Sequence, residues 1–247
     1  MKPAARLLLD ARCPRRPLEA LPEACRPHDA GSAYAIQDEL VAALGGIGGW
    51  KVGASSPAAE PGCSPLPAPG IVPSGHVFPR DTFALNGLEA EIGFTLGRHL
   101  PPRAMPYTGD DVLAAIRSVH PVIEIVDSRY VDMRAVDALS ALADFASHGA
   151  LVVGPGRTDG LRVDQTRQAV RLEAGEVLLY DGVGGNAAGD VFRLLAWLAN
   201  HAAARCGGLR AGQVVTTGSC SGLAFARAPA RVRAMLAGIG ACEVTLA

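Results

Sequence analysis

The most informative part of this sequence is Leu88-Glu89-Ala90-Glu91-Ile92-Gly93-Phe94-Thr95-Leu96. Its residue types alternate along the chain, which is typical of a β-strand whose two faces have different surroundings. The alternation places Glu89 and Glu91 on one face and the apolar side chains on the other. We therefore expect two carboxylates to lie close together, at strand positions where an apolar or neutral side chain is usual.

A second stretch, Pro121-Val122-Ile123-Glu124-Ile125-Val126-Asp127, is apolar on both faces except at Glu124, which predicts a strand buried on both sides. A buried carboxylate needs a cation, hydrogen bonds or a proton, and no lysine or arginine lies within the strand. Three carboxylates around one point favour a divalent cation between them. Ligation by oxygen alone suits Mg²⁺ or Mn²⁺ better than zinc.

The same residues also fit an interpretation without a metal. Alternating strands often carry charged side chains on a solvated outer face, and Glu89 and Glu91 would be ordinary there. In that interpretation Glu124 pairs with an arginine elsewhere in the chain. The local pattern alone leaves both interpretations open.

Composition limits the class of protein. The chain has 247 residues, of which 49% are hydrophobic and 19% charged, so we expect a globular protein with a substantial core. A net charge of −1 gives no electrostatic reason to expect nucleic acid or an anionic membrane as a partner. The N-terminus lacks the apolar core of a signal peptide and no stretch approaches transmembrane length, so a cytoplasmic location is expected. The six cysteines form no C-x-x-C pair and are expected to be reduced.

Helices are expected mainly near the N-terminus, with strands and one long helix following. The expected helices span 4–12, 29–44, 110–119 and 190–205, and further strands span 151–153, 177–180, 214–217 and 242–246. Residues 56–79 are dense in proline and glycine, which predicts an irregular crossing. Because no βαβ rhythm repeats, the pattern favours an α+β fold. We divide it into an N-terminal helical region, 1–55, and a metal-binding catalytic core, 56–247, joined in one continuous unit.

Several motifs, in order along the chain, resemble those of one enzyme family. They are Tyr34-Ala35-Ile36-Gln37, Gly49-Trp50-Lys51-Val52-Gly53 with Ser55-Ser56, Glu89-Ala90-Glu91-Ile92-Gly93-Phe94, Ile123-Glu124-Ile125-Val126-Asp127-Ser128-Arg129, Ala143-Asp144 with Ala146-Ser147, Ala196-Trp197-Leu198-Ala199-Asn200, and the segment from Leu209 to Ser219. On these motifs the chain resembles, nearly end to end, the 2-keto-4-pentenoate hydratase and 4-oxalocrotonate decarboxylase group of the fumarylacetoacetate hydrolase superfamily. Several ordered motifs are far more specific than any one alone.

The resemblance implies a mixed β-roll or sandwich with N-terminal helices, assembled as a homo-oligomer. It also implies that Glu89, Glu91 and Glu124 hold Mg²⁺ or Mn²⁺, in agreement with the metal interpretation of these residues. The implied substrate is a small 2-oxo or 2-hydroxydienoic acid that chelates the cation through its oxygens. We expect a lyase that hydrates a 2-hydroxypenta-2,4-dienoate-like acid to a 4-hydroxy-2-oxo acid.

Three alternatives stay open within this resemblance. The first is a decarboxylase of the 4-oxalocrotonate type, and a partner enzyme of the same pathway is conceivable because such hydratases and decarboxylases can associate. The second is a C–C bond hydrolase, which ranks lower because His28 is accompanied only by loop residues. The third is a degenerate member that binds a 2-oxo acid without turning it over.

Lys51 is the first candidate for proton transfer or for binding the substrate carboxylate. It lies between Gly48-Gly49 and Gly53, in a segment whose glycines let backbone approach a ligand. Ser55 and Ser56 are candidate hydrogen-bond donors to the substrate carboxylate.

Further residues are expected to line or support the site. Asp144 is a candidate catalytic group, and Ser147 and Ser219 are candidate substrate-binding groups. Asp127 and Arg129 are expected to form an ion pair, either orienting the third glutamate or acting as a structural salt bridge.

The chain departs from the family pattern in the residues around the site. Pro67-Ala68-Pro69-Gly70 stands where typical hydratases carry an acidic residue, so the expected acid/base aspartate is absent. Phe145 replaces a polar residue, which predicts a smaller or more apolar pocket, and Gly189-Asp190-Val191 replaces the glycine-proline that usually opens the late helix. His76 is the candidate to replace the lost proton carrier.

A different enzyme class is suggested by Gly218-Ser219-Cys220-Ser221-Gly222, which fits a nucleophile elbow with cysteine in place of serine. A helix should follow such an elbow, but Pro229 interrupts the segment early, and no histidine lies downstream of Cys220. The pattern therefore disfavours a thiol nucleophile.

Overall fold

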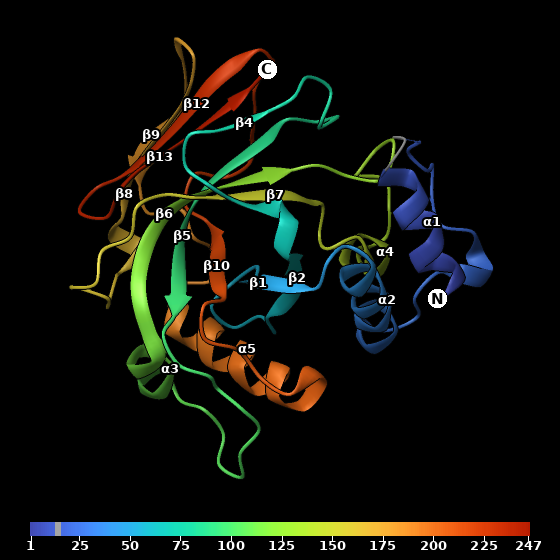
Figure 1. Cartoon of the computed structure of the whole chain (residues 1–247), viewed down its shortest axis with the longest axis horizontal. Helices are drawn as coiled ribbons and strands as arrows, with labels where there is room; N and C mark the ends of the chain where they lie inside the picture. The colour runs from blue at the N-terminus through green and yellow to red at the C-terminus, as the bar shows by residue number, and fades with distance from the viewer. Residues whose placement is uncertain (13–15) are drawn as a thin grey trace.

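A computed structural model describes residues 1–12 and 16–247 and shows a mixed α/β fold with two β-sheets and few helices (Figure 1). The helices are α1 (Pro3–Arg12), α2 (Ala30–Ala43), α3 (Gly109–Ala115), α4 (Ala138–Ala143) and α5 (Val191–Cys206), with 3₁₀ turns at Glu23–Cys25, Ala68–Gly70 and Gln165–Arg167. The strands are β1 (Ile47–Gly53), β2 (Gly62–Pro67), β3 (Ile71–Pro73), β4 (His76–Phe78), β5 (Gly87–Leu96), β6 (Ile116–Val126), β7 (His148–Val153), β8 (Ala169–Ala174), β9 (Val177–Val183), β10 (Val214–Ser219), β11 (Ala224–Phe225), β12 (Ala230–Leu236) and β13 (Gly240–Leu246).

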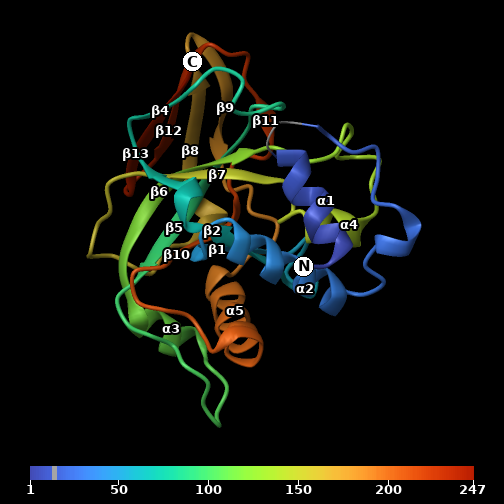
Figure 2. The ribbon, with the colours of Figure 1, turned by 45° about the vertical axis from the view of Figure 1, so that its right-hand side comes forward.

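The larger sheet has the strand order β2-β1-β10-β5-β6-β7-β3, with β11 added beside β5. Its β1–β10 and β3–β7 pairs are parallel and its other pairs antiparallel. The smaller sheet has the order β4-β13-β12-β8-β9. Figure 1 shows this smaller sheet at the upper left and helices α1, α2 and α4 together on the opposite side, and the turned view in Figure 2 keeps that separation.

Strands β5 and β6 form the centre of the larger sheet. Ala90 and Phe94 on one face of β5 are fully buried in the main hydrophobic core, whereas Glu89 and Glu91 lie on the other face. The antiparallel register places Glu89 opposite Glu124 of β6. Both strands expected from the sequence are therefore present, and they are hydrogen-bonded neighbours.

Helices α2 and α5 begin and end where local chemistry favours it. Asp29 caps α2 through the backbone N–H of Ser32, and Asp190 caps α5 through that of Phe192. Helix α5 ends at Gly207, whose φ of +79° is the left-handed conformation that glycine adopts most easily. Helix α5 packs on β1 and β10, while α1, α2 and α4 surround a second hydrophobic cluster.

Two expectations about local structure are wrong. The helix expected at 110–119 ends at Ala115, because Ile116 already begins the long strand β6 that pairs along β5. The crossing expected to be irregular, 56–79, contains β2, β3 and β4. All three are edge strands, where a proline without its N–H removes no necessary ladder hydrogen bond.

Strand β1 begins before residue 55, where the sequence suggested a division, and the division itself stays a prediction. Helix α2 stops at Ala43, and β1 is already hydrogen-bonded between β2 and β10 of the larger sheet. No helix among the described residues has the length and apolar character needed to cross a membrane.

The segment that resembles a nucleophile elbow has no such role in this structure. Cys220 is fully buried, and burial raises the pKa of its thiol to about 12. The chain continues from β10 into the short strand β11 rather than into a helix. A buried thiol that stays protonated is not an activated nucleophile.

Candidate metal centre and active-site cavity

Three glutamates converge on the face of the larger sheet opposite the main core. Glu89, Glu91 and Glu124 each offer one carboxylate oxygen, and these oxygens lie within 4.8 Å of one another. The convergence follows from the register, since Glu89 and Glu124 are cross-strand partners and Glu91 lies two residues further along the same face. The proximity expected from the sequence is confirmed.

Glu91 is fixed by donors from β10. It accepts a hydrogen bond from the Thr216 hydroxyl and another from the backbone N–H of Gly218, at 3.1 Å. The β5–β10 register shifts between Thr216 and Ser219, and Gly218 has a φ of +91° there. This irregularity needs a glycine, because other residues rarely adopt that backbone conformation.

Glu124 is fully buried and its two oxygens differ. Its Oε1 accepts hydrogen bonds from Lys51 Nζ at 2.6 Å and from His148 Nδ1 at 2.9 Å. Its Oε2 is buried and has no hydrogen-bond partner. Buried carboxylate oxygens are normally satisfied, so this atom is available for a further ligand.

The charges of this cluster are unbalanced. Burial, followed by the charge of Glu124, raises the pKa of Glu89 to about 7, and the same causes raise that of Glu91 well above its usual value. Burial opposes ionisation of Glu124 as well, but Lys51 and His148 lower its pKa below the usual value. Burial would lower the pKa of Lys51, yet the neighbouring carboxylates raise it, so Lys51 is charged. One lysine thus faces three carboxylates, and a divalent cation would compensate the excess negative charge.

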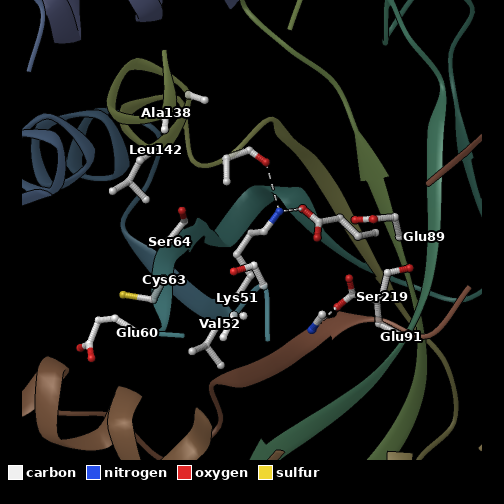
Figure 3. A pocket seen from close by; sticks show the side chains of 18 residues that line it. Lys51, Val52, Glu60, Cys63, Ser64, Glu89, Glu91, Ala138, Leu142 and Ser219 are labelled. Atoms are coloured by element: carbon white, nitrogen blue, oxygen red, sulfur yellow. Dashed lines mark hydrogen bonds and ion pairs between the residues drawn. The ribbon is translucent and has the colours of Figure 1, made fainter. Parts of the chain in front are cut away.

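A cavity of about 690 Å³ extends from these carboxylates (Figure 3). Lys51 lies between the glutamates on one side and the residues of α4 on the other, which contribute Ala138, Ala141 and Leu142. Glu60, on the loop between β1 and β2, also lines the cavity. The cavity therefore has an anionic end and an apolar wall, and Lys51 carries the only positive charge among the described residues that line it.

A model of the fumarylacetoacetate hydrolase C-terminal domain matches residues 68–247 of this chain. The chain belongs to the fumarylacetoacetate hydrolase family. This part includes all three glutamates of the cluster, whereas Lys51 precedes it.

Curated hydratases and a solved decarboxylase structure are similar to this chain over 63% to 99% of its length. A 2-keto-4-pentenoate hydratase of Paraburkholderia phymatum is 31% identical over 98% of this chain and 95% of its own length. A 2-hydroxyhexa-2,4-dienoate hydratase of Comamonas testosteroni is 34% identical over 63% of this chain and 58% of its own length. The structure of 4-oxalocrotonate decarboxylase from Pseudomonas putida G7, complexed with magnesium and adipate, superposes with a TM-score of 0.85 at 24% identity, covering 99% of this chain and 96% of that one. At that identity the superposition shows the shared fold.

The cavity brings together some of the residues singled out in the sequence. Lys51, Ser55 and Ser219 line it together with the glutamates. Ser56 does not line it, and its hydroxyl accepts a hydrogen bond from the N–H of Ala59, as in a local turn. Ser147 is buried in the backbone segment before β7 and is not among the lining residues either.

Asp144 and His76 are not among the residues that line the cavity. Asp144 is fully buried and accepts hydrogen bonds from Arg129, at 2.6 Å from Nε and 3.0 Å from the backbone N–H. Arg129 forms an ion pair with Asp144, and the expected pair with Asp127 stays a prediction. His76 pairs in β4 with Val244 of β13, in the smaller sheet.

Sequence reasoning missed His148, Glu60 and the role of α4. His148 follows three residues with left-handed backbone, Phe145, Ala146 and Ser147, whose φ angles are 52°, 49° and 61°. Nothing in the sequence indicates that run, which turns the chain into β7 beside Glu124. Glu60 was visible only as one acidic residue of a proline-rich segment.

Proposed function

We propose that this protein is a metal-dependent hydro-lyase that hydrates a 2-hydroxypenta-2,4-dienoate-like acid to a 4-hydroxy-2-oxo acid. The observation that carries the proposal is the convergence of Glu89, Glu91 and Glu124 at one end of a cavity with an apolar opposite wall. The full-length similarity to 2-keto-4-pentenoate hydratases supports the same reaction.

The residues present fit a divalent cation, Mg²⁺ or Mn²⁺. The buried, partnerless Oε2 of Glu124 and the raised pKa values of Glu89 and Glu91 are what a carboxylate cluster shows when positive charge is lacking. When bound, such a cation supplies Lewis acidity that stabilises negative charge on the oxygens of a 2-oxo acid. The magnesium in the similar decarboxylase structure supports this choice of ion.

The chain's own groups would bind and protonate the substrate. Lys51 is charged, so its Nζ can hold the substrate carboxylate or give a proton inside the cavity. Ser55 and Ser219 line the same space and can donate hydrogen bonds to substrate oxygens. Since Ala68 stands where an acidic residue is usual, we assign proton transfer first to Lys51.

The cavity favours hydration over decarboxylation of 4-oxalocrotonate. That substrate carries a second carboxylate, which would face Ala138, Ala141 and Leu142 without a cation to pair with. Burying an unpaired charge is costly, and Glu60 would add repulsion. A decarboxylase remains the second candidate, supported by similarity to such enzymes over 62% of this chain.

The test compares the two substrates directly. Purified protein is incubated with 2-hydroxypenta-2,4-dienoate or 4-oxalocrotonate, with and without Mg²⁺, while conjugated absorbance and carbon dioxide are followed. We expect Mg²⁺-dependent loss of absorbance with the first substrate and little carbon dioxide from the second. Turnover that is unchanged by a chelator would contradict a metal-dependent reaction, and carbon dioxide release would support the decarboxylase.

Several expectations remain predictions beside this proposal. They concern a β-roll or sandwich arrangement of the sheets, a homo-oligomer, a partner enzyme of the same pathway and a cytoplasmic location. C–C bond hydrolysis and non-catalytic binding of a 2-oxo acid remain further alternatives. The same incubation separates both of them from a hydratase or a decarboxylase, because either would leave the two substrates intact.

A further inference from the structure

His148 is a fully buried side chain in direct contact with the carboxylate cluster. Its Nδ1 lies 2.9 Å from Glu124 Oε1, the oxygen that also accepts from Lys51 at 2.6 Å. Both donors therefore bond to Oε1 of Glu124, and Oε2 has no hydrogen-bond partner. The carboxylate is divided into one oxygen bound by the protein and one that remains available.

The two donors differ in rigidity. Lys51 reaches the carboxylate through a flexible four-carbon stem. His148 has a compact ring, and its backbone carbonyl accepts hydrogen bonds from Arg129 Nη2 at 3.0 Å and from Arg12 Nη2 at 3.5 Å. Two guanidinium groups thus fix the backbone that carries the ring. The terminal torsion of a glutamate is otherwise broad, so the rigid donor is the one that can set its orientation.

The hydrogen bond also defines the state of the ring. A carboxylate only accepts, so Nδ1 must carry the proton that it donates to Glu124. His148 Nε2 is buried and has no partner. A neutral ring leaves a lone pair at Nε2 rather than an unpaired buried charge, which would cost far more.

We propose that His148 is a positioning residue that orients the Glu124 carboxylate so that Oε2 is presented to the divalent cation. The inference rests on the proposed function, because it concerns a cation held by the three glutamates. His148 touches neither substrate nor cation in this account. It acts through Glu124, in the way that hydrogen-bond partners of metal ligands commonly do.

The test measures binding of Mn²⁺ to the metal-free protein by isothermal titration and by the electron paramagnetic resonance signal of free Mn²⁺. The variant His148→Leu removes the donor, and His148→Asn and His148→Gln place an amide nitrogen near Nδ1 and near Nε2, respectively. We expect His148→Leu and His148→Gln to bind Mn²⁺ about 10- to 100-fold more weakly. His148→Asn should recover most of that loss.

The matched control is His120→Leu. His120 lies on β6 like Glu124 and bonds through its ring to Thr95, Ser118 and the carbonyl of Gly154. Its replacement also removes a hydrogen-bonded histidine from the sheet but should leave Mn²⁺ affinity unchanged. Thermal unfolding of every variant shows whether it is folded. If His148→Leu does not fold, the difference in Mn²⁺ affinity between His148→Asn and His148→Gln tests the proposal.

The outcomes separate the two proposals. If the wild-type protein binds Mn²⁺ and all three His148 variants bind it equally well, the role of His148 is overturned while the metal site stands. The same conclusion follows if Asn and Gln weaken binding to the same degree. If the wild-type protein binds no Mn²⁺, both the proposed function and this inference are overturned.

Discussion

Glu91 is buried, and its surroundings supply hydrogen-bond donors but too little positive charge, so its pKa is raised well above its usual value. Both of its known partners, the Thr216 hydroxyl and the Gly218 N–H, donate to it. The change Glu91→Gln keeps the size, and its carbonyl oxygen can still accept from both donors, but the amide carries no charge and offers one ligand oxygen fewer. We expect Mg²⁺-dependent hydration to fall on the order of 10²-fold or more.

The rate is measured with 2-hydroxypenta-2,4-dienoate at saturating Mg²⁺, with Glu173→Gln as the control. Glu173 is a glutamate of β8 that pairs with Arg171 in the other sheet, so its replacement should leave the rate unchanged. Equal rates for Glu91→Gln and the wild-type protein would exclude Glu91 from the site.

Glu89 gives a prediction about stability and pH. Its pKa in the folded protein is about 7, above its ordinary value of 4.5, because of burial and the charge of Glu124. Between these values the folded state keeps a proton that the unfolded state has lost, so this group's stabilising contribution is present at low pH and is lost as pH rises. We expect the unfolding free energy of the metal-free wild-type protein, relative to Glu89→Gln, to decrease from about pH 5 to about pH 8.

Denaturant unfolding in a chelator measures this difference, and Glu89→Gln serves as the reference because its amide does not titrate. Added Mg²⁺ should reverse the trend, since a cation stabilises the ionised carboxylates. A difference that is independent of pH would show that Glu89 ionises normally in the folded protein.

At the scale of elements, α5 holds the loop between β1 and β2 against the cavity. Arg193 donates to the carbonyls of Ala59 and Ser56 at 3.2 and 3.3 Å, and Trp197 Nε1 donates to Glu60 Oε1 at 2.6 Å. The change Arg193→Met keeps much of the side-chain volume but releases both carbonyls. We expect KM to rise about 5- to 10-fold with a smaller change in kcat, because loop order contributes about 1 kcal/mol to substrate binding.

Steady-state kinetics test this, with Arg231→Met as the control, since Arg231 is an exposed residue of β12 in the smaller sheet. An effect confined to kcat would contradict a role of Arg193 in ordering the binding loop.

The elements also show where sequence patterns suffice. Strand β5 and helix α5 were predicted because alternation and capping are local signals. The end of α3 is not predictable from local signals, because Ile116 belongs to β6, which pairs with the distant strand β5. The prolines in 56–79 suggested irregular structure, since the sequence does not show that β2, β3 and β4 lie at sheet edges.

At the scale of the whole molecule, the cavity joins the sheet to the N-terminal helices. Helix α4 packs with α1 and α2 and presents Ala138, Ala141 and Leu142 to the cavity opposite the glutamates (Figure 3). The change Leu142→Arg would place a cation on this apolar wall. We expect it to improve kcat/KM for a substrate with a second carboxylate, relative to 2-hydroxypenta-2,4-dienoate, by about 10-fold or more, equivalent to about 1.4 kcal/mol.

Competition between the two substrates measures this ratio, with Leu142→Met as the control that keeps the wall apolar. An unchanged ratio would show that the substrate tail does not reach α4.

The candidate site was therefore only partly predictable. Glu89, Glu91 and Glu124 stood out because a charged residue is unusual in an apolar strand, and pairing of two strands is enough to bring them together. His148 and the wall of α4 depend on left-handed backbone at 145–147 and on helix packing far along the chain. These contacts have no local signature in the sequence. For the same reason the sequence suggests Asp144 and His76 as catalytic groups, although neither lines the cavity.

The most direct test of the metal site is a crystal structure of the protein soaked with Mn²⁺, with anomalous diffraction used to locate the ion. We expect one anomalous peak at ligation distance, about 2 Å, from oxygens of Glu89, Glu91 and Glu124, including Oε2 of Glu124. A map without a peak among these carboxylates at saturating Mn²⁺, or with Arg or Lys nitrogens occupying that point, would contradict this expectation.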